Sequence, residues 1–233
     1  MQETLEMVQK AIEEKKQLHH VVVNAGKIVQ MQNDYELKES VNSSDIINAD
    51  GQAVVWASRY LGKPLKERVA GIDLMINLVE YASKKNYKIY LLGAKEEVVK
   101  TVVNLYKKNY GDHIIAGYRN GYFKKDEQIQ IAKEISESGA NMLFVAISSP
   151  MKENFLYDYR DQLKAVNFIM GVGGSFDVIS GKVKRAPRWM QKAGLEWLFR
   201  FLQEPRRMWK RYLVGNTKFI WMVMKEKMRQ VKE

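Results

Sequence analysis

The sequence has no cysteine, and it has only three histidines and four prolines in 233 residues. Without cysteine, neither a disulfide framework nor a thiolate metal site can form. The histidines are His19, His20 and His113, and their spacing is not that of a zinc site. A chain of this length buries enough apolar surface to fold without covalent staples, so we predict a core held by packing alone.

Long uncharged apolar runs are also missing. No stretch of about 18 such residues occurs, so no transmembrane helix is predicted. The first residues, MQETLEMVQKAIEEKKQ, form an amphipathic pattern of mixed charge and lack the apolar centre of a secretory signal. We therefore expect a cytoplasmic protein.

The basic excess is confined to one end of the chain. Residues 1–181 hold 23 Lys and Arg against 23 Asp and Glu, whereas residues 182–233 hold 15 against 4, which accounts for the whole net charge of +11. Such asymmetry indicates an anionic partner for this end: membrane lipid, a phosphorylated substrate or nucleic acid. We predict two parts, an α/β core over 1–181 and a helical appendage over 182–233.

Short apolar runs alternate with helical patterns in the first part. Such alternation predicts an α/β fold with a Rossmann-like parallel sheet and helices on both faces. In such sheets ligands bind beyond the carboxyl ends of the strands. The expected strands lie within 19–26, 45–51, 87–94, 113–118, 141–150 and 165–174.

The last expected strand ends in GVGGSFD, which is suited to phosphate binding. Glycines at 171, 173 and 174 allow close backbone approach, and backbone N–H groups in such a turn bind phosphate. A tight strand exit without a ligand is an equal alternative. Phe176 stands where a dinucleotide fingerprint would have its third glycine, which disfavours an NAD-dependent oxidoreductase.

The second expected strand ends in NADG. Asp50 in this motif could accept a proton from an attacking hydroxyl as a general base. A simple Asp-Gly turn is the alternative interpretation, and from the local pattern alone it is the stronger one.

The appendage interleaves cations with aromatic rings. This mixture suits a membrane interface, where rings lie at the headgroup level and cations meet anionic lipid. Arginine also binds diphosphates in a bidentate fork. A solvated face or a nucleic-acid-binding tail are alternatives, although no nucleic-acid-binding motif is recognised. The residues are Arg185, Arg188, Arg200, Arg206, Arg207, Lys210 and Arg211, with Trp189, Trp197, Phe199, Phe201, Trp209 and Trp221.

Several long motifs occur together and in a characteristic order: NADGQAVVWASRYLGKPLKERVAGIDLM, YKIYLLGA, GYF at 121–123, LFVAISSP and GVGGSFDVISGKVKRAP…GLEWLFRFLQEPRR. In these motifs, from Met7 to the region of Arg207, the chain resembles the bacterial cell-surface polysaccharide glycosyltransferases of glycosyltransferase family 26. This family makes wall teichoic acid linkage units, enterobacterial common antigen and capsule. The resemblance implies a cell-surface polysaccharide transferase.

The resemblance also implies the reaction and the partners. The expected reaction is an inverting, metal-independent transfer of N-acetylmannosamine or a related hexose derivative from a UDP-sugar to an undecaprenyl-diphosphate-linked sugar, and no DxD-type metal motif occurs. No cofactor is expected. The appendage would dock on the anionic inner face of the plasma membrane, and its apolar residues could also support a homo-oligomer.

Site residues follow from the same resemblance. Asp50 is the expected base, and Arg200, Arg207 and Lys210 are the expected ligands of the acceptor diphosphate. The chain departs from the family at Val22, where threonine is usual, and at Lys152, where glutamine is frequent; both are candidates for donor specificity. The expected nucleotide-sugar site comprises Asn24, Gly51, Gly93, Gly171, Gly173, Gly174, Ser175 and Asp177.

Overall fold

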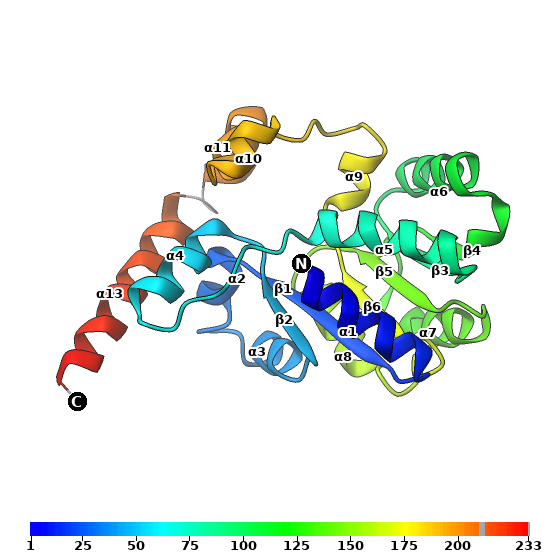
Figure 1. The fold of residues 1–233 in the computed structure, drawn as a ribbon, viewed down its shortest axis with the longest axis horizontal. Coiled ribbons are helices and arrows are strands. Elements are labelled where there is room, and N and C mark those ends of the chain that lie inside the picture. Colours follow the sequence, from blue (N-terminus) through cyan, green and yellow to red (C-terminus); the bar gives the residue numbers. More distant parts are fainter. Residues whose placement is uncertain (210–212, 233) are drawn as a thin grey trace. The chain divides into compact units, whose positions relative to one another are not determined.

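The computed structural model describes residues 1–209 and 213–232, with backbone alone at 192, 207, 208 and 232 (Figure 1). The strands are β1 (Leu18–Val23), β2 (Ile46–Ala49), β3 (Ile89–Gly93), β4 (Ile115–Arg119), β5 (Met142–Ala146) and β6 (Phe168–Gly171). The helices before β6 are α1 (Gln2–Glu13), α2 (Ala25–Gln30), α3 (Tyr35–Asn42), α4 (Gln52–Tyr60), α5 (Gly71–Lys85), α6 (Glu96–Tyr110), α7 (Gln128–Glu137) and α8 (Met151–Asp158). After β6 come α9 (Ser175–Ile179), α10 (Arg188–Lys192), α11 (Glu196–Gln203), α12 (Pro205–Trp209) and α13 (Gly215–Lys232). Two 3-10 helices, η1 (Asp112–Ile114) and η2 (Lys125–Glu127), precede β4 and α7.

The six strands form one sheet in the order β2-β1-β6-β5-β3-β4, and all are parallel. Each of the six predicted strands is present, and the predicted α/β fold with a Rossmann-like sheet is confirmed. The central strands are buried along their whole length, which is why they read as unbroken apolar runs.

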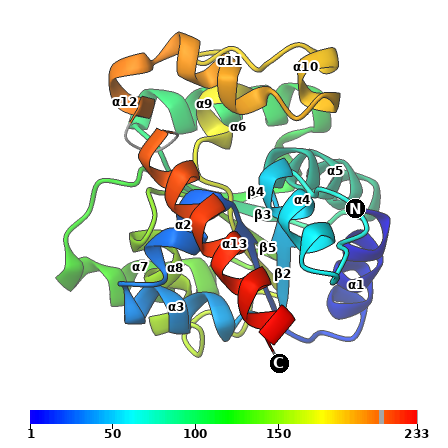
Figure 2. The same ribbon diagram turned by 90° about the vertical axis from the view of Figure 1, so that its left-hand side faces the viewer.

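Helices cover both faces of the sheet. On one face α7 and α8 pack on a cluster that includes Leu92, Leu143, Val145 and Ile169. The alternate residues of the same strands point to the opposite face, because successive side chains of a strand alternate. There α1 and α5 lie across the sheet from α7 and α8 (Figure 2).

Two prolines lie at the starts of helices in the appendage. Pro187 precedes the first residue of α10, and Pro205 is the first residue of α12. Proline lacks an N–H group and fits the start of a helix, where no intrahelical partner is needed. Helix α8 ends at Asp158, although the segment MKENFLYDYRDQL (151–163) predicts a helix over its whole length.

The chain divides into two compact units. Unit 1 comprises residues 1–21, 39–47 and 71–183, and unit 2 comprises 22–38, 48–70 and 184–233. The contacts therefore group the basic C-terminal segment with the chain around the ends of β1 and β2. The functional division predicted at residue 181 is a different boundary and stays a prediction.

Unit 2 has its own apolar core, to which the last helix contributes. Phe219 of α13 is buried against Ala25, Val54 and Val55, and Val223 packs on the same cluster. Helix α13 runs across α2 (Figure 2), and a methyl group at Gly215 would lie 4.0 Å from Gly26 Cα. One face of α13 is thus fixed to the α/β part of unit 2.

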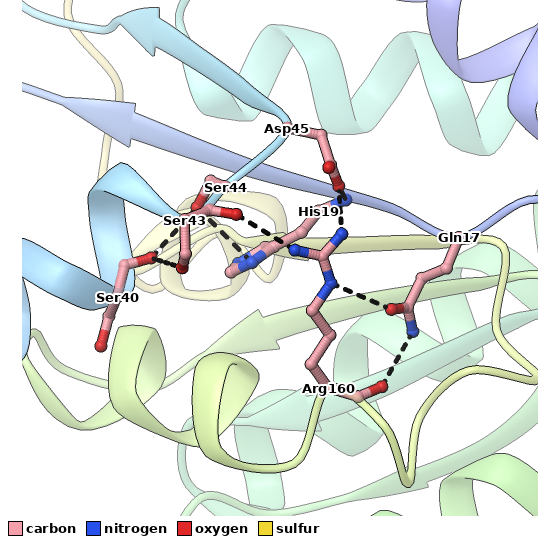
Figure 3. A network of polar contacts seen from close by, with 7 residues as sticks. All are labelled: Gln17, His19, Ser40, Ser43, Ser44, Asp45 and Arg160. Carbon is pink, nitrogen blue, oxygen red and sulfur yellow. Dashed lines mark hydrogen bonds and ion pairs between the residues drawn. The ribbon is translucent and has the colours of Figure 1, made fainter.

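A polar network joins β1, the segment before β2 and the end of α8 in unit 1 (Figure 3). Arg160 donates to Asp45 Oδ2 at 2.7 Å and to the Ser43 carbonyl at 3.0 Å. The same Asp45 oxygen accepts the backbone N–H of His19 at 2.7 Å. His19 is 1% exposed, and its Nδ1 lies 3.5 Å from the Ser44 hydroxyl oxygen. Arg160 therefore takes part in tertiary bonding just beyond the point where α8 ends.

Burial of His19 should make the stability of the protein depend on pH. Burial lowers the pKa of His19 from 6.5 to about 4, and the positive charge of Arg160 adds to this effect, while Asp45 opposes it. Between pH 4 and pH 6.5, His19 therefore binds a proton more readily in the unfolded chain than in the folded one. The free energy of unfolding is therefore highest above pH 6.5, where His19 is neutral in both states, and it falls as pH falls toward 4. Between pH 7 and pH 5 the loss is about 2 kcal/mol.

Urea denaturation at pH 7 and pH 5 measures this effect. The variant His19→Gln should lose about 2 kcal/mol less than the wild type between the two pH values. His113→Gln, which changes an exposed histidine, is the matched control and should behave as the wild type. An equal pH dependence in the His19→Gln variant would contradict the assignment.

Candidate active site

The residues predicted for the site fall into two groups, one in each unit. Unit 2 contains Val22, Asn24, Asp50, Gly51 and Arg200. Unit 1 contains the glycine-rich residues at the ends of β3 and β6, together with Lys152.

The Asp50–Gly51 turn lies directly against the end of β1. The backbone N–H of Asp50 donates to the Val23 carbonyl at 2.9 Å, and a methyl group at Gly51 would lie 3.3 Å from Asn24 Cβ. Gly51 thus allows the close approach of the two strand ends. The turn starts α4, so Asp50 is placed by a strand on one side and a helix on the other.

Asn24 has a structural role that its motif did not reveal. Its side-chain oxygen accepts the backbone N–H of Lys27 at 3.1 Å and so caps the start of α2. The cap fixes the side chain next to the Asp50–Gly51 turn, with its oxygen turned toward the helix. A ligand contact by Asn24 would therefore use the amide nitrogen.

Lys27 is a buried cation near this turn that the sequence interpretation missed. Its side chain is 7% exposed, and Nζ donates to the Val22 carbonyl at 2.5 Å. The Val22 side chain is itself buried at the end of β1. Lysine is rarely buried, but nothing in the local pattern distinguishes Lys27 from a surface lysine of α2.

The glycine loop after β6 has an open backbone, and two of its side chains have partners close by in the sequence. A methyl group at Gly173, where φ is +54°, or at Gly174 would meet no atom within 4 Å. The Ser175 hydroxyl donates to the Val172 carbonyl at 2.7 Å, and the Asp177 carboxylate lies 3.7 Å from Lys182 Nζ. These contacts stabilise the turn, and a nucleotide role for the loop stays a prediction.

Gly93 is explained by packing alone. Its φ is +131°, and a methyl group there would lie 2.5 Å from the carbonyl carbon and oxygen of Ala146. Gly121, from the GYF motif, approaches the same turn, because a methyl group on it would lie 3.0 Å from Gly93 Cα. Only glycine fits at the end of β3, with or without a ligand.

Lys152 is engaged in a buried ion pair. Its Nζ lies 2.6 Å from Glu153 Oε1, and the two side chains are 7% and 2% exposed. The Lys152 methylenes lie across the end of β6, since a methyl group at Gly171 would be 3.0 Å from Lys152 Cδ. A lysine that sets donor specificity at this position would meet an acidic sugar or a phosphate of the donor. That role stays a prediction, and any donor anion would share this amine with Glu153.

The appendage contributes ordered cations to unit 2. Arg200 Nη2 lies 3.6 Å from Glu196 Oε1, and the same carboxylate pairs with Arg68 and Arg185. Gly194, between α10 and α11, lies against α4, because a methyl group there would be 2.8 Å from Gln52 Cγ. The appendage thus contacts the helix that follows the Asp50 turn. The side chain of Arg207 and the whole of Lys210 lie outside the described residues.

Two further structural results bear on the site. Among the described residues, no group of three or more His, Asp and Glu side chains is arranged to hold a metal ion. Over the same part of the chain, no helix combines the length and the apolar character needed to cross a membrane.

Comparison with known proteins identifies relatives over most of the chain. Residues 1–233 match the family described as "Glycosyl transferase WecG/TagA/CpsF family". A relative from Bacillus subtilis (strain 168) is 41% identical over 194 residues, which are 83% of this chain and 73% of the relative. A second relative, from Bacillus spizizenii (strain ATCC 23059 / NRRL B-14472 / W23), is 38% identical over 192 residues, which are 82% of this chain and 73% of the relative.

Both relatives are named N-acetylglucosaminyldiphosphoundecaprenol N-acetyl-beta-D-mannosaminyltransferase. The resemblance predicted from the motifs is therefore confirmed over the whole chain. The chain belongs to the WecG/TagA/CpsF family of glycosyl transferases and is a glycosyltransferase of cell-surface polysaccharide synthesis.

Proposed function

We propose that this protein transfers N-acetylmannosamine, or a related hexose derivative, from a UDP-sugar to an undecaprenyl-diphosphate-linked N-acetylglucosamine. The names of both relatives support the acceptor and the transferred sugar. The observation that carries the proposal is the Asp50–Gly51 turn, which packs against Asn24 in the same compact unit as the arginine-bearing appendage. A base and a set of cations are the two groups that such a transfer requires.

The proposed reaction is a single inverting displacement. Asp50 takes the proton from the acceptor hydroxyl, and the hydroxyl oxygen forms a bond with the anomeric carbon of the donor sugar. The bond from this carbon to the UDP oxygen breaks on the opposite face, and UDP leaves with the electron pair. Cations such as Arg200 offset the charge that develops on the diphosphate, which is the role that a metal ion has in other transferases.

We further propose that the enzyme works while bound to the inner face of the plasma membrane through α13. The face of α13 opposite Phe219 is exposed and combines apolar side chains with cations. Trp221 is 63% exposed, and Lys225 Nζ lies 5.3 Å from the centre of its ring. Rings and cations on one helix face suit the headgroup region of an anionic bilayer. The exposed apolar residues are Ile220, Trp221, Met224, Met228 and Val231.

A transfer assay with defined substrates tests the proposal. The full-length protein is mixed with a UDP-sugar and a polyprenyl-diphosphate-linked N-acetylglucosamine, with and without a chelator. We expect a new disaccharide lipid with UDP-N-acetylmannosamine or a related donor, the same rate with chelator, and inverted configuration at the anomeric carbon. A panel of UDP-sugars with no product would contradict the donor class, and loss of activity with chelator would contradict a metal-independent reaction.

A further inference from the structure

Lys27 bonds to the chain on both sides of the point where β1 ends. Its backbone N–H donates to the Asn24 side-chain oxygen at 3.1 Å, and its Nζ donates to the Val22 carbonyl at 2.5 Å. Asn24 is the first residue after β1, and Val22 is the last but one residue of the strand. Lys27 thus closes residues 22–27 into a loop through its main chain and its side chain, and the whole loop belongs to unit 2.

The proposed base is attached to the same strand end from the other edge. The backbone N–H of Asp50 donates to the Val23 carbonyl at 2.9 Å, at the edge of β1 that lies next to β2. Successive carbonyls of a strand point to opposite edges, so the Val22 carbonyl faces away from Asp50. Lys27 and Asp50 therefore bond to neighbouring peptide groups at the end of β1, one on each edge.

The Asp50–Gly51 turn also rests on the loop that Lys27 closes. A methyl group at Gly51 would lie 3.3 Å from Asn24 Cβ and 3.9 Å from the backbone nitrogen of Ala25. These distances leave no room for another side-chain atom between the turn and the loop. A shift of the loop would therefore displace the turn that carries Asp50.

Lys27 is 7% exposed, although a lysine on a short helix normally extends into solvent. Ala25, Ile28 and Val29 pack on the apolar core of unit 2. Residues three and four positions apart share one helix face, so these three side chains form the apolar face of α2. Lys27 lies on a different face, from which its side chain reaches the carbonyl of Val22.

We propose that Lys27 is a positioning residue for sugar transfer, which fixes the end of β1 and thereby the turn that carries Asp50. This inference rests on the proposed function, in which Asp50 accepts the proton of the acceptor hydroxyl. A misplacement of about 1 Å in an active site lowers a rate by as much as about 10²-fold. Firm attachment of the strand end therefore has a direct effect on the reaction.

A cap for one carbonyl does not by itself explain the choice of lysine. Water or a neutral side chain satisfies a carbonyl at a strand end, and a buried ammonium costs more to desolvate than either. A hydrogen bond from a charged donor is about twice as strong as one from a neutral donor. The ammonium of Lys27 therefore holds the Val22 carbonyl more firmly than an amide would, and such rigid support is what a catalytic group requires.

Hydrogen exchange of the Asp50 amide tests the positioning in the full-length protein without any substrate. Lys27→Met keeps the length of the side chain but removes the donor. The bond from the Asp50 N–H to the Val23 carbonyl should then open more often, and the Asp50 amide should exchange about 10-fold faster. Lys27→Arg, which keeps the charge and the donors, should restore part of the protection.

The amides of β5 in unit 1 are the internal control and should keep the wild-type exchange rate in Lys27→Met. An Asp50 amide that exchanges at the wild-type rate in this variant would overturn the proposal. Equal acceleration at Asp50 and in β5 would overturn it as well, because it would show a general loss of stability.

Steady-state rates separate positioning from substrate binding. Lys27→Met should lower kcat for sugar transfer by about 10–100-fold and leave the KM of donor and acceptor within twofold, because the proposed role involves no contact with either. Lys38→Met makes the same change at an exposed lysine of unit 2 and should keep the wild-type rate. A higher KM for either substrate at unchanged kcat would overturn the proposal and assign Lys27 to substrate binding.

A double variant shows whether Lys27 acts through Asp50. In the background Asp50→Asn, the change Lys27→Met should have little further effect on the rate. An equal cost in both backgrounds would overturn the assignment. Hydrogen exchange does not depend on sugar transfer, so faster exchange at Asp50 in a protein that transfers no sugar would support the attachment by Lys27 and contradict the proposed function.

Discussion

Replacing Asp50 with asparagine is expected to lower the rate of sugar transfer by about 10²–10⁴-fold, the usual contribution of a general base. Asparagine keeps the shape of the side chain but cannot accept the proton of the acceptor hydroxyl. The backbone N–H of residue 50 would still donate to the Val23 carbonyl, so the turn should persist. Initial rates at saturating donor and acceptor measure the effect, because the loss should appear in kcat.

An exposed aspartate provides the control for this experiment. Asp161→Asn makes the same chemical change at an exposed site in unit 1 and should leave the rate unchanged. Melting curves of both variants should match the wild type. Turnover close to that of the wild type in Asp50→Asn would remove Asp50 from the mechanism, and a large fall in Asp161→Asn would show that the assay responds to net charge.

Replacing the apolar side chains on the exposed face of α13 should release the protein from anionic vesicles. The triple variant Trp221→Ser, Met224→Ser and Met228→Ser leaves the charge of α13 unchanged. Each large apolar side chain removed from water contributes about 1.5–3 kcal/mol. Because burial at a membrane interface is partial, we expect vesicle binding to weaken by about 100-fold. Co-sedimentation with vesicles that contain anionic lipid measures this loss.

The structure offers a matched control on the helices of unit 1. Ile76→Ser, Leu105→Ser and Ile129→Ser together remove three exposed apolar side chains and should leave vesicle binding intact. Phe219 remains in place in both triple variants, so unit 2 should keep its core. Vesicle binding unchanged in the α13 variant would contradict the proposed membrane face. A wild-type protein that prefers duplex DNA to vesicles at the same salt concentration would favour a nucleic-acid partner.

The strands and the fold class could be predicted because they depend on local patterns. A strand buried on both faces needs a continuous apolar run, and β3, β5 and β6 each show one. The breaks before α10 and at α12 follow from the chemistry of single prolines. The local pattern of residues 151–163 does not indicate that α8 ends at Asp158, and it cannot indicate the bonds of Arg160 to Asp45 and Ser43, which lie more than a hundred positions away.

The candidate site was predictable only in part. The motifs indicated Asn24, Asp50 and the glycine loop, but not that Asn24 caps α2 or that the Ser175 hydroxyl bonds within its own turn. The pairing of Lys152 with Glu153 was equally invisible, because neighbouring residues of a helix do not normally face each other.

The sequence by itself determined the α/β architecture, the family and the basic character of the C-terminal segment, since periodicity, motifs and charge are properties of the chain in one dimension. Only the tertiary structure decided which of those charges act together. Arg68 and Glu196 are separated by 128 positions, yet a hydrogen bond of 3.2 Å joins their side chains. The physical reason is that Coulomb and hydrogen-bond energies depend on distance in space, which folding sets independently of distance along the chain.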